Sequence, residues 1–216
     1  MGIGKLAFLE FVDEAIGGGP RQERVIRGDY FVDERLGLGF VKPSAWLFHS
    51  FEDFHSILRG QTFIDGSDDD SEEFAADWNT LIGVVSKYPI GVTDDPGSNK
   101  FGPGFTIFRD AGLRDEVASD LEAAVGNAIM YYSELLREFR VLESPRSQTI
   151  SMCPALRYTS QFVFEHREFL PTLVRDRTLV IDQGRHIYTI HLYDSPATGE
   201  AVGAEYEAFI GSLHLA

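Results

Sequence analysis

The stretch GRHIYTIHLYDSPATGEAVGAEYEAFIGSLHL, from Gly184 to Leu215, decides the fold. Its first part, Arg185–Tyr193, is rich in aromatic and β-branched residues, which is typical of a β-strand. From Gly199 to Leu213, apolar residues recur every three or four positions and predict an amphipathic helix. The inward face of that helix comprises Val202, Tyr206, Phe209, Ile210 and Leu213. The stretch therefore predicts a strand followed by a helix that covers a sheet.

A long helix and a run of strands precede this stretch. In the segment Asp115–Phe139, one set of side chains follows spacings of 4, 4, 3, 4, 3 and 4, which is one stripe of an α-helix. The stripe consists of Val117, Leu121, Val125, Ala128, Tyr132, Leu135 and Phe139. Strand-like runs follow at Arg140–Ile150, Ala155–Glu165 and Thr172–Asp182. A tight turn at Asp182–Arg185 joins the last of these to Arg185–Tyr193, because Gly184 permits a positive φ.

The N-terminal half predicts shorter elements. Arg24–Lys42 is expected to form a β-hairpin with its turn near Glu34–Gly37. Ser50, followed three residues later by Asp53, is typical of a helix start, and the helix is expected to end at Gly60. Two further strands are predicted at Leu81–Ser86 and Phe105–Arg109.

These elements predict the α+β class, with an antiparallel sheet of about six strands covered by helices. We expect residues 21–216 to form a single α+β domain. Residues 1–20 are expected to form a helical appendage, because Gly17-Gly18-Gly19-Pro20 stops a helix. An acidic insertion is expected at 61–78.

Composition narrows the function classes. The chain has 216 residues with 19 Lys and Arg against 34 Asp and Glu, a net charge of −15. This charge argues against nucleic-acid binding through a basic face. A single cysteine, Cys153, fits a reducing compartment, and neither a membrane span nor a secretory signal is evident. We therefore expect a cytoplasmic protein.

No motif for catalysis or metal binding emerges. His49 and His55, six apart, and His186 and His191, five apart, lack metal-ligand spacing and are expected to lie at the surface or rim. The acidic run beginning at Asp65 does not fit a calcium loop, because Asp70 stands where glycine is required. We therefore assign no catalytic residue, no cofactor and no metal.

Partner-binding candidates come from two features. The segment 65–73 holds six carboxylates and no basic residue; its charge would steer a basic partner, with Asp68, Asp69, Asp70, Glu72 and Glu73 as the candidates. Aromatic side chains in or near loops are frequent binding anchors, and here they are Trp46, Trp78 and Phe101. Packing in the core is the alternative fate of these three rings.

The chain resembles the PsbP-like family over about Arg24 to Leu215. The resemblance rests on Tyr188 and Ile190 of the last strand, the Asp194-Ser195-Pro196 loop and the helix ending Phe209-Ile210-Gly211-Ser212-Leu213. The opening hairpin, which ends with Pro43 and Trp46, also fits. The family includes PsbP, the Ran-binding import factor of yeast and Eag-type type VI secretion adaptors. The resemblance implies an α/β/α sandwich that binds other proteins and is not an enzyme.

The adaptors of that family hold transmembrane segments on an apolar concave sheet face. The same use here would line a groove with Tyr158, Phe162, Tyr188 and Ile190. Alternation along the strands does not separate this groove face from the core face.

The sequence thus predicts a non-enzymatic protein-binding domain that acts as an adaptor, chaperone or assembly factor, with secretion among the processes that the resemblance implies. The partner would be a protein with a basic or apolar patch. One alternative is an immunity protein that neutralises a basic toxin, since small acidic proteins suit that role. A second alternative is an enzyme whose site is assembled from residues far apart in sequence.

Overall fold

The computed structural model describes residues 24–58, 61–62, 81–89, 102–110, 120–167, 170–196 and 199–216. A small antiparallel sheet has the strand order β1 (Arg24–Arg27), β2 (Tyr30–Asp33), β3 (Leu38–Val41) and β12 (His214–Leu215). Within the segment Arg24–Lys42, where one hairpin was expected, β2 and β3 form that hairpin, and β1 adds a third strand that pairs with β2. The turn of the hairpin ends at Gly37, whose φ is 61° and whose N–H donates to the Glu34 carbonyl.

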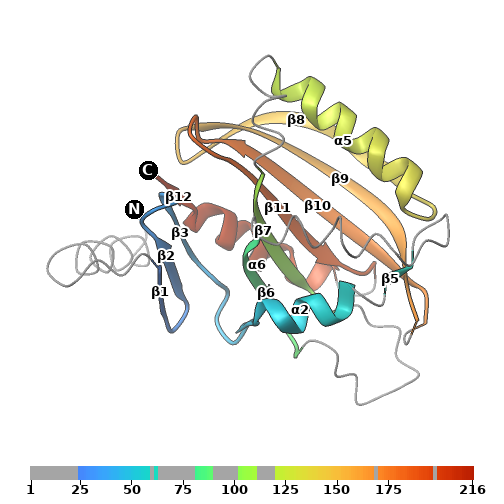
Figure 1. Cartoon of the computed structure of the whole chain (residues 1–216), viewed down its shortest axis with the longest axis horizontal. Helices are drawn as coiled ribbons and strands as arrows, with labels where there is room; N and C mark the ends of the chain where they lie inside the picture. The colour runs from blue at the N-terminus through green and yellow to red at the C-terminus, as the bar shows by residue number, and fades with distance from the viewer. Residues whose placement is uncertain are drawn as a thin grey trace, which may run out of the picture.

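A large eight-stranded sheet forms the body of the structure (Figure 1). Its order is β4 (Leu47–Phe48), β6 (Leu81–Ser86), β7 (Gly104–Asp110), β11 (Ile187–Asp194), β10 (Thr172–Asp182), β9 (Cys153–His166) and β5 (Gln61–Thr62). The eighth strand, β8 (Arg140–Ile150), also pairs with β9 and follows it with two register shifts. Every strand pair in the two sheets is antiparallel.

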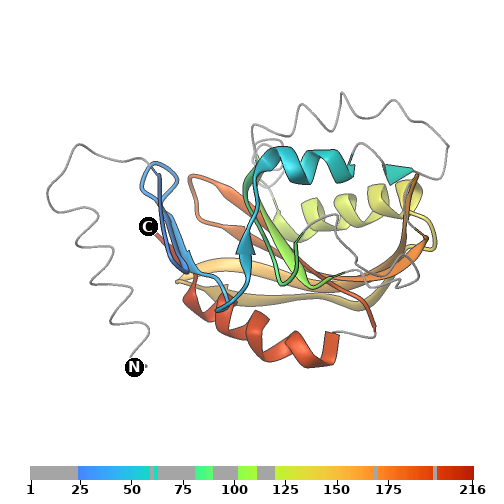
Figure 2. The same ribbon diagram turned by 90° about the horizontal axis from the view of Figure 1, so that it is seen from below.

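Helices cover both faces of the large sheet. Figure 2 shows α6 (Gly199–Ser212) on one face, with α2 (Phe51–Leu58) and α5 (Leu121–Leu135) on the other. We call these the α6 face and the α5 face. Side chains start two of the helices: Ser50 Oγ accepts from the Asp53 N–H, and Asp120 Oδ1 accepts from the Glu122 N–H. The predicted capping by Ser50 is therefore confirmed.

The main hydrophobic core lies on the α6 face. Side chains of α6 pack there against strands of both sheets, and the rings of Phe105 and Phe209 stack at 4.0 Å. Phe40 of β3 meets Phe209 edge-on at 5.5 Å, which fastens the small sheet to α6. A smaller cluster lies on the α5 face and consists of Ala124, Val125, Leu156, Tyr158, Val180 and Ile187.

The predicted α+β class, with an antiparallel sheet between helices, is confirmed. The expectation of about six strands is corrected to an eight-stranded sheet beside a four-stranded one. The additional strands are β1, β4, β5 and β12, of which the last three have two residues each, too few to show a period. The long helix ends at Leu135 and does not reach Phe139, because Leu136 is extended and Glu138 has a φ of 54°.

The structure describes only part of the segments for which boundaries were predicted at the N-terminus and around the insertion. The appendage at 1–20 lies outside the described residues. Of the segment 61–78, only Gln61 and Thr62 are described, and they form β5. The arrangement of the chain into one domain therefore stays a prediction.

The hairpin between β8 and β9 turns through two residues with unfavourable backbone conformations. Ser151 has a φ of 48° and Met152 a φ of 68°, although neither is glycine. Such two-residue turns favour glycine at the second position. The Met152 side chain is 94% exposed, so little packing compensates for the strain.

We predict that Met152→Gly raises the free energy of unfolding by about 0.5–1 kcal/mol, because glycine adopts a positive φ without the usual penalty. Urea unfolding measures the change. Gly184→Ala is the matched control in the β10–β11 hairpin, where φ is 87° and an added Cβ meets no atom within 4 Å. That control is expected to lose stability through backbone strain alone. A loss of stability in Met152→Gly would contradict the prediction.

Candidate functional site

Three charged residues in the middle of β10 organise the polar chemistry of the large sheet. Arg175, Asp176 and Arg177 are consecutive, so their side chains alternate between the two faces. The two arginines lie on the α6 face, where both contact Asp194 of β11. Asp176 lies on the α5 face, where it contacts His191 of the same neighbouring strand. The triplet therefore divides its charges across the sheet.

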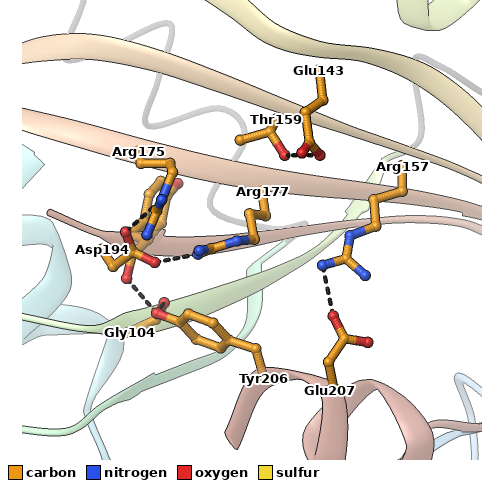
Figure 3. A network of polar contacts seen from close by, with 10 residues as sticks. Gly104, Glu143, Arg157, Thr159, Arg175, Arg177, Asp194, Tyr206 and Glu207 are labelled. Atoms are coloured by element: carbon orange, nitrogen blue, oxygen red, sulfur yellow. Dashed lines mark hydrogen bonds and ion pairs between the residues drawn. The ribbon is translucent and has the colours of Figure 1, made fainter. Parts of the chain in front are cut away.

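The network on the α6 face is centred on Asp194, whose side chain is completely buried. Arg175 Nε donates to Asp194 Oδ1 at 2.9 Å, and Arg177 Nη1 donates to the other carboxylate oxygen (Figure 3). The Tyr206 hydroxyl of α6 donates to the Tyr193 carbonyl, and the Arg177 guanidinium lies 5.5 Å from the centre of the Tyr206 ring. This network joins β10, β11 and α6, so its role is structural.

Further polar contacts lie on the same face of the sheet. Arg157 of β9 pairs with Glu207 of α6 at 2.8 Å, and Thr159 Oγ1 donates to Glu143 of β8 at 3.0 Å (Figure 3). Burial, followed by the negative charge of Asp194, raises the pKa of Tyr206. The Tyr206 phenol therefore stays protonated and available as a hydrogen-bond donor at neutral pH.

The α5 face carries a second, more compact group of polar side chains. We call it the polar cluster; it consists of Thr106, Tyr158, Asp176, Thr178, His191 and Tyr193. Its centre is the contact of His191 Nδ1 with Asp176 Oδ2 at 2.8 Å. Thr178 Oγ1 donates to the same carboxylate oxygen at 3.1 Å. The Asp176 and His191 residues are 6% and 7% exposed, so water has little access to the pair.

Aromatic rings surround the imidazole of His191. Tyr193 stacks on it at 5.6 Å, nearly parallel, and Phe108 of β7 meets it edge-on at 6.0 Å. Tyr132 of α5 reaches it from above the sheet, with 6.4 Å between ring centres. Burial, and then the charge of Asp176, raises the pKa of both Tyr158 and Tyr193. Both phenols are therefore neutral at physiological pH.

The contact orients the imidazole of His191. A proton on Nδ1 points at the Asp176 carboxylate, and Nε2 is the second ring nitrogen, on the far side of the ring from that contact. Asp176 and His191 thus have the geometry of an acid–base pair. Within the described part of the chain, no group of three or more His, Cys, Asp or Glu side chains is placed to hold a metal ion.

Cys153, the single cysteine, lies at the start of β9 and is partly buried. Burial, and then the negative charge of Asp182, raises the pKa of its thiol. The thiol is therefore protonated and weakly nucleophilic at neutral pH.

The aromatic anchor expected at Trp46 does not match the structure. Trp46 is 2% exposed, packs against the Tyr206 ring at 5.7 Å and donates its indole N–H to Glu205 at 3.1 Å. Its neighbours on α6 satisfy both its apolar ring and its polar atom, so a partner cannot reach it. Core packing, the alternative considered for this residue, is what the structure shows.

The groove residues proposed from the resemblance do not share one face. Tyr188 and Ile190 are fully buried in the main core on the α6 face. Tyr158 and Phe162 have the opposite parity in the β9–β10–β11 register and lie on the α5 face, where both are buried. The expectation of a single groove lined by all four residues is therefore wrong. Tyr158 instead belongs to the polar cluster. The remaining candidates, Asp68, Asp69, Asp70, Glu72, Glu73, Trp78 and Phe101, lie outside the described residues.

Asp176 and His191 were missed by the sequence analysis, which placed His191 at the surface or rim. The available signal was the charged triplet inside an otherwise apolar strand, TLVRDRTLVID. A strand covered on both faces must pair such charges or lose stability. What no sequence pattern supplies is the register that sets His191 beside Asp176.

A different kind of surface lies on α5 and β8, which pack against each other. Four large apolar side chains are exposed there: Met130, Tyr131, Val141 and Leu142. We call this set the α5–β8 surface. Figure 1 shows both elements running along the same border of the large sheet. None of the described helices has the length and apolar character needed to span a membrane.

The chain matches no protein-family model, and its sequence is similar to no curated protein. Its structure is similar to that of cyanobacterial PsbP from Synechocystis, with a TM-score of 0.49, 12% identity, and coverage of 93% of this chain and 99% of that one. It is also similar to a protein of unknown function from Pseudomonas aeruginosa, with a TM-score of 0.45, 15% identity, and coverage of 59% and 88%. Both likenesses concern the path of the chain and not its function.

We predict that Asp194→Asn lowers the free energy of unfolding by about 3 kcal/mol, because it leaves Arg175 and Arg177 without their buried counter-ion. Chemical denaturation measures the loss. Glu207→Gln is the control, since Glu207 is 60% exposed and its pair with Arg157 is worth little. Equal losses in the two variants would contradict a special role for Asp194.

A second prediction concerns alkaline pH. Burial, and then the charge of Asp33, raises the pKa of Tyr188 to about 12, and its hydroxyl donates to the Leu36 carbonyl. In the unfolded chain the pKa is near 10, so the stabilisation is complete below pH 10 and is lost as pH rises toward 12. We expect Tyr188→Phe to remove up to about 2 kcal/mol of this loss, measured by urea unfolding between pH 9 and 12. An unchanged slope in the variant would contradict the assignment.

Proposed function

We propose that this protein is a non-enzymatic binding domain that recognises another protein through the α5–β8 surface. The observation that carries the proposal is the exposure of Met130, Tyr131, Val141 and Leu142 on two adjoining elements. Single exposed apolar residues are common, but several gathered on neighbouring elements mark interaction sites. Met and Tyr are moreover enriched in the cores of protein interfaces.

The exposure of β8 also supports binding through the α5–β8 surface. Its first residues, from Arg140 to Ser147, are exposed, and among the described strands it pairs with β9 alone. A partner therefore has access to the side chains of β8 and to the outer side of α5. Arg137, just after α5, is held by Glu165 of β9, which keeps the connection between α5 and β8 close to the sheet.

The chemistry of the partner follows from charge and polarity. The net charge of −15 favours a partner with a basic patch, because opposite charges accelerate association. The exposed apolar side chains favour an apolar patch at the centre of the contact. We propose that the protein acts as an adaptor, chaperone or assembly factor, and that it does so in the cytoplasm, where a lone cysteine such as Cys153 stays reduced.

The Asp176–His191 pair favours a second candidate function, an enzyme with a dispersed site. An imidazole oriented by a carboxylate is a common general base. The described residues around the pair offer threonine and tyrosine hydroxyls, and the tyrosine pKa values are raised, which makes those phenols poor nucleophiles. The binding function is therefore the one we favour.

We predict that the double variant Met130→Ser/Val141→Ser loses its partner while keeping its stability. Affinity capture from the native cell, followed by reconstitution with the purified partner, measures binding. Ile26→Ser/Tyr88→Ser is the matched control, because those side chains are 52% and 55% exposed on other strands and loops. We expect at least tenfold weaker binding in the first variant and little change in the control.

Two results would count against the proposal. One is equal binding by both double variants, which would move the interface elsewhere. The other is turnover of a small molecule that depends on His191 but not on Met130 or Val141, which would support the dispersed enzyme site.

A further inference from the structure

The α5 face of the large sheet differs from the α6 face in a way that points to a ligand. At the middle of the sheet, the α6 face presents Leu179, Ile190 and Ile107 side by side. The adjacent positions on the α5 face are polar and nearly all buried, across four strands: Thr106, Tyr158, Ser160, Asp176, Thr178 and His191. Burying so many polar groups costs stability unless they are used.

Two buried side-chain oxygens on this face, Asp176 Oδ1 and Thr189 Oγ1, have no hydrogen-bond partner among the described residues. Asp176 Oδ2 contacts His191 Nδ1 and accepts from Thr178 Oγ1, so the unpaired oxygen of this carboxylate is Oδ1. A carboxylate oxygen in this situation is unusual, because a buried charge normally fills its hydrogen-bonding capacity. The two nearest guanidinium groups along the strand, those of Arg175 and Arg177, lie on the other face and are bound to Asp194.

Among the described residues, no Lys or Arg side chain forms an ion pair with Asp176, whose one ionic contact is with His191. Tyr158 and Tyr193 are held neutral, so they add hydroxyl groups and ring faces but no further charge. The rings of Tyr193, Phe108 and Tyr132 gather around the imidazole. A carboxylate with an unpaired oxygen beside several aromatic rings is an environment that organic cations prefer, because it offers both charge-assisted hydrogen bonds and cation–π contacts.

We propose that the polar cluster beneath α5 is a binding site for an ammonium or guanidinium group, with Asp176 Oδ1 as its hydrogen-bond acceptor. Such a group can belong to a free amine or to a Lys or Arg side chain of a peptide. An anion would be repelled by Asp176. A metal ion finds only Asp176 and His191 as ligands here, and the described residues hold no larger group of this kind.

The second half of α5 is the part that an incoming group would displace. The buried residues of α5 are Ala124 and Val125, both in its first half. Farther along, Ile129, Tyr132 and Leu135 are only half-buried over the sheet. Elements with few buried apolar contacts open locally at low free-energy cost, so this end of the helix can admit a ligand without global unfolding.

The test follows the imidazole resonances of His191 by NMR in the full chain, with assignment from a His191→Gln variant. Ethylammonium and spermidine are titrated into the protein, and sodium chloride at equal ionic strength is the control. Acetyl-Gly-Lys-Gly-amide and acetyl-Gly-Arg-Gly-amide form the peptide arm. We expect saturable shifts with at least one probe, and the arm that binds more tightly identifies a free amine or a side chain as the ligand. Asp176→Asn is expected to weaken binding at least tenfold, whereas Glu207→Gln, which removes the same charge on the α6 face, leaves it unchanged.

Several outcomes would overturn the proposal. These are shifts that follow ionic strength alone, equal binding by wild type and Asp176→Asn, or saturation by zinc ions at lower concentration than by any amine. Should Asp176→Asn not fold, Tyr132→Leu replaces it: loss of the ring is expected to weaken binding several-fold, and unchanged affinity would count against the site. This proposal does not depend on the α5–β8 surface, so either can fail alone.

Discussion

The buried carboxylate of Asp194 is the interaction on which the rest of the structure depends. It lies at the end of β11, where the chain leaves the large sheet for α6. Arg175 and Arg177 of β10 hold it from one side, and Tyr206 of α6 bonds the adjoining Tyr193 carbonyl. The strand, its neighbour and the helix are thereby fixed together at one point. Because Phe209 of the same helix carries the small sheet, this contact also determines where β3 and β12 can lie.

The same arrangement explains why the two faces of the sheet have different tasks. On the α6 face both arginines are paired with Asp194, so the buried carboxylate there has its counter-ions. The α5 face keeps Asp176 with a neutral or protonated imidazole as its only described ionic partner. A fold that needed nothing from the α5 face would gain stability from apolar residues at these positions. The α6 face thus stabilises the sheet, and the α5 face carries the polar cluster.

Much of the fold could be predicted from local pattern. The strands Leu81–Ser86, Arg140–Ile150 and Thr172–Asp182 have the predicted bounds, because each is long enough to show its composition and ends in turn residues. Contacts between distant segments could not be predicted, as the pairing of β12 with β3 shows. The face of the sheet to which each strand side chain points could not be predicted either, because helices cover both sides of β9 and β11. Tyr158 and Tyr188 therefore look alike in sequence although they point in opposite directions. His191 needed the register of β10 and β11 before its carboxylate could be found.

The outer strand β8 has a consequence for how this molecule meets others. Pro145 lies within it and lacks an N–H, and the register shifts at Val141/Glu143 and Glu143/Arg146 interrupt its regular pleat. Such a border is a poor template for another strand, which protects the chain from self-association by sheet extension. Recognition at this edge must accordingly be read from side chains and not from a continuous ladder of backbone groups.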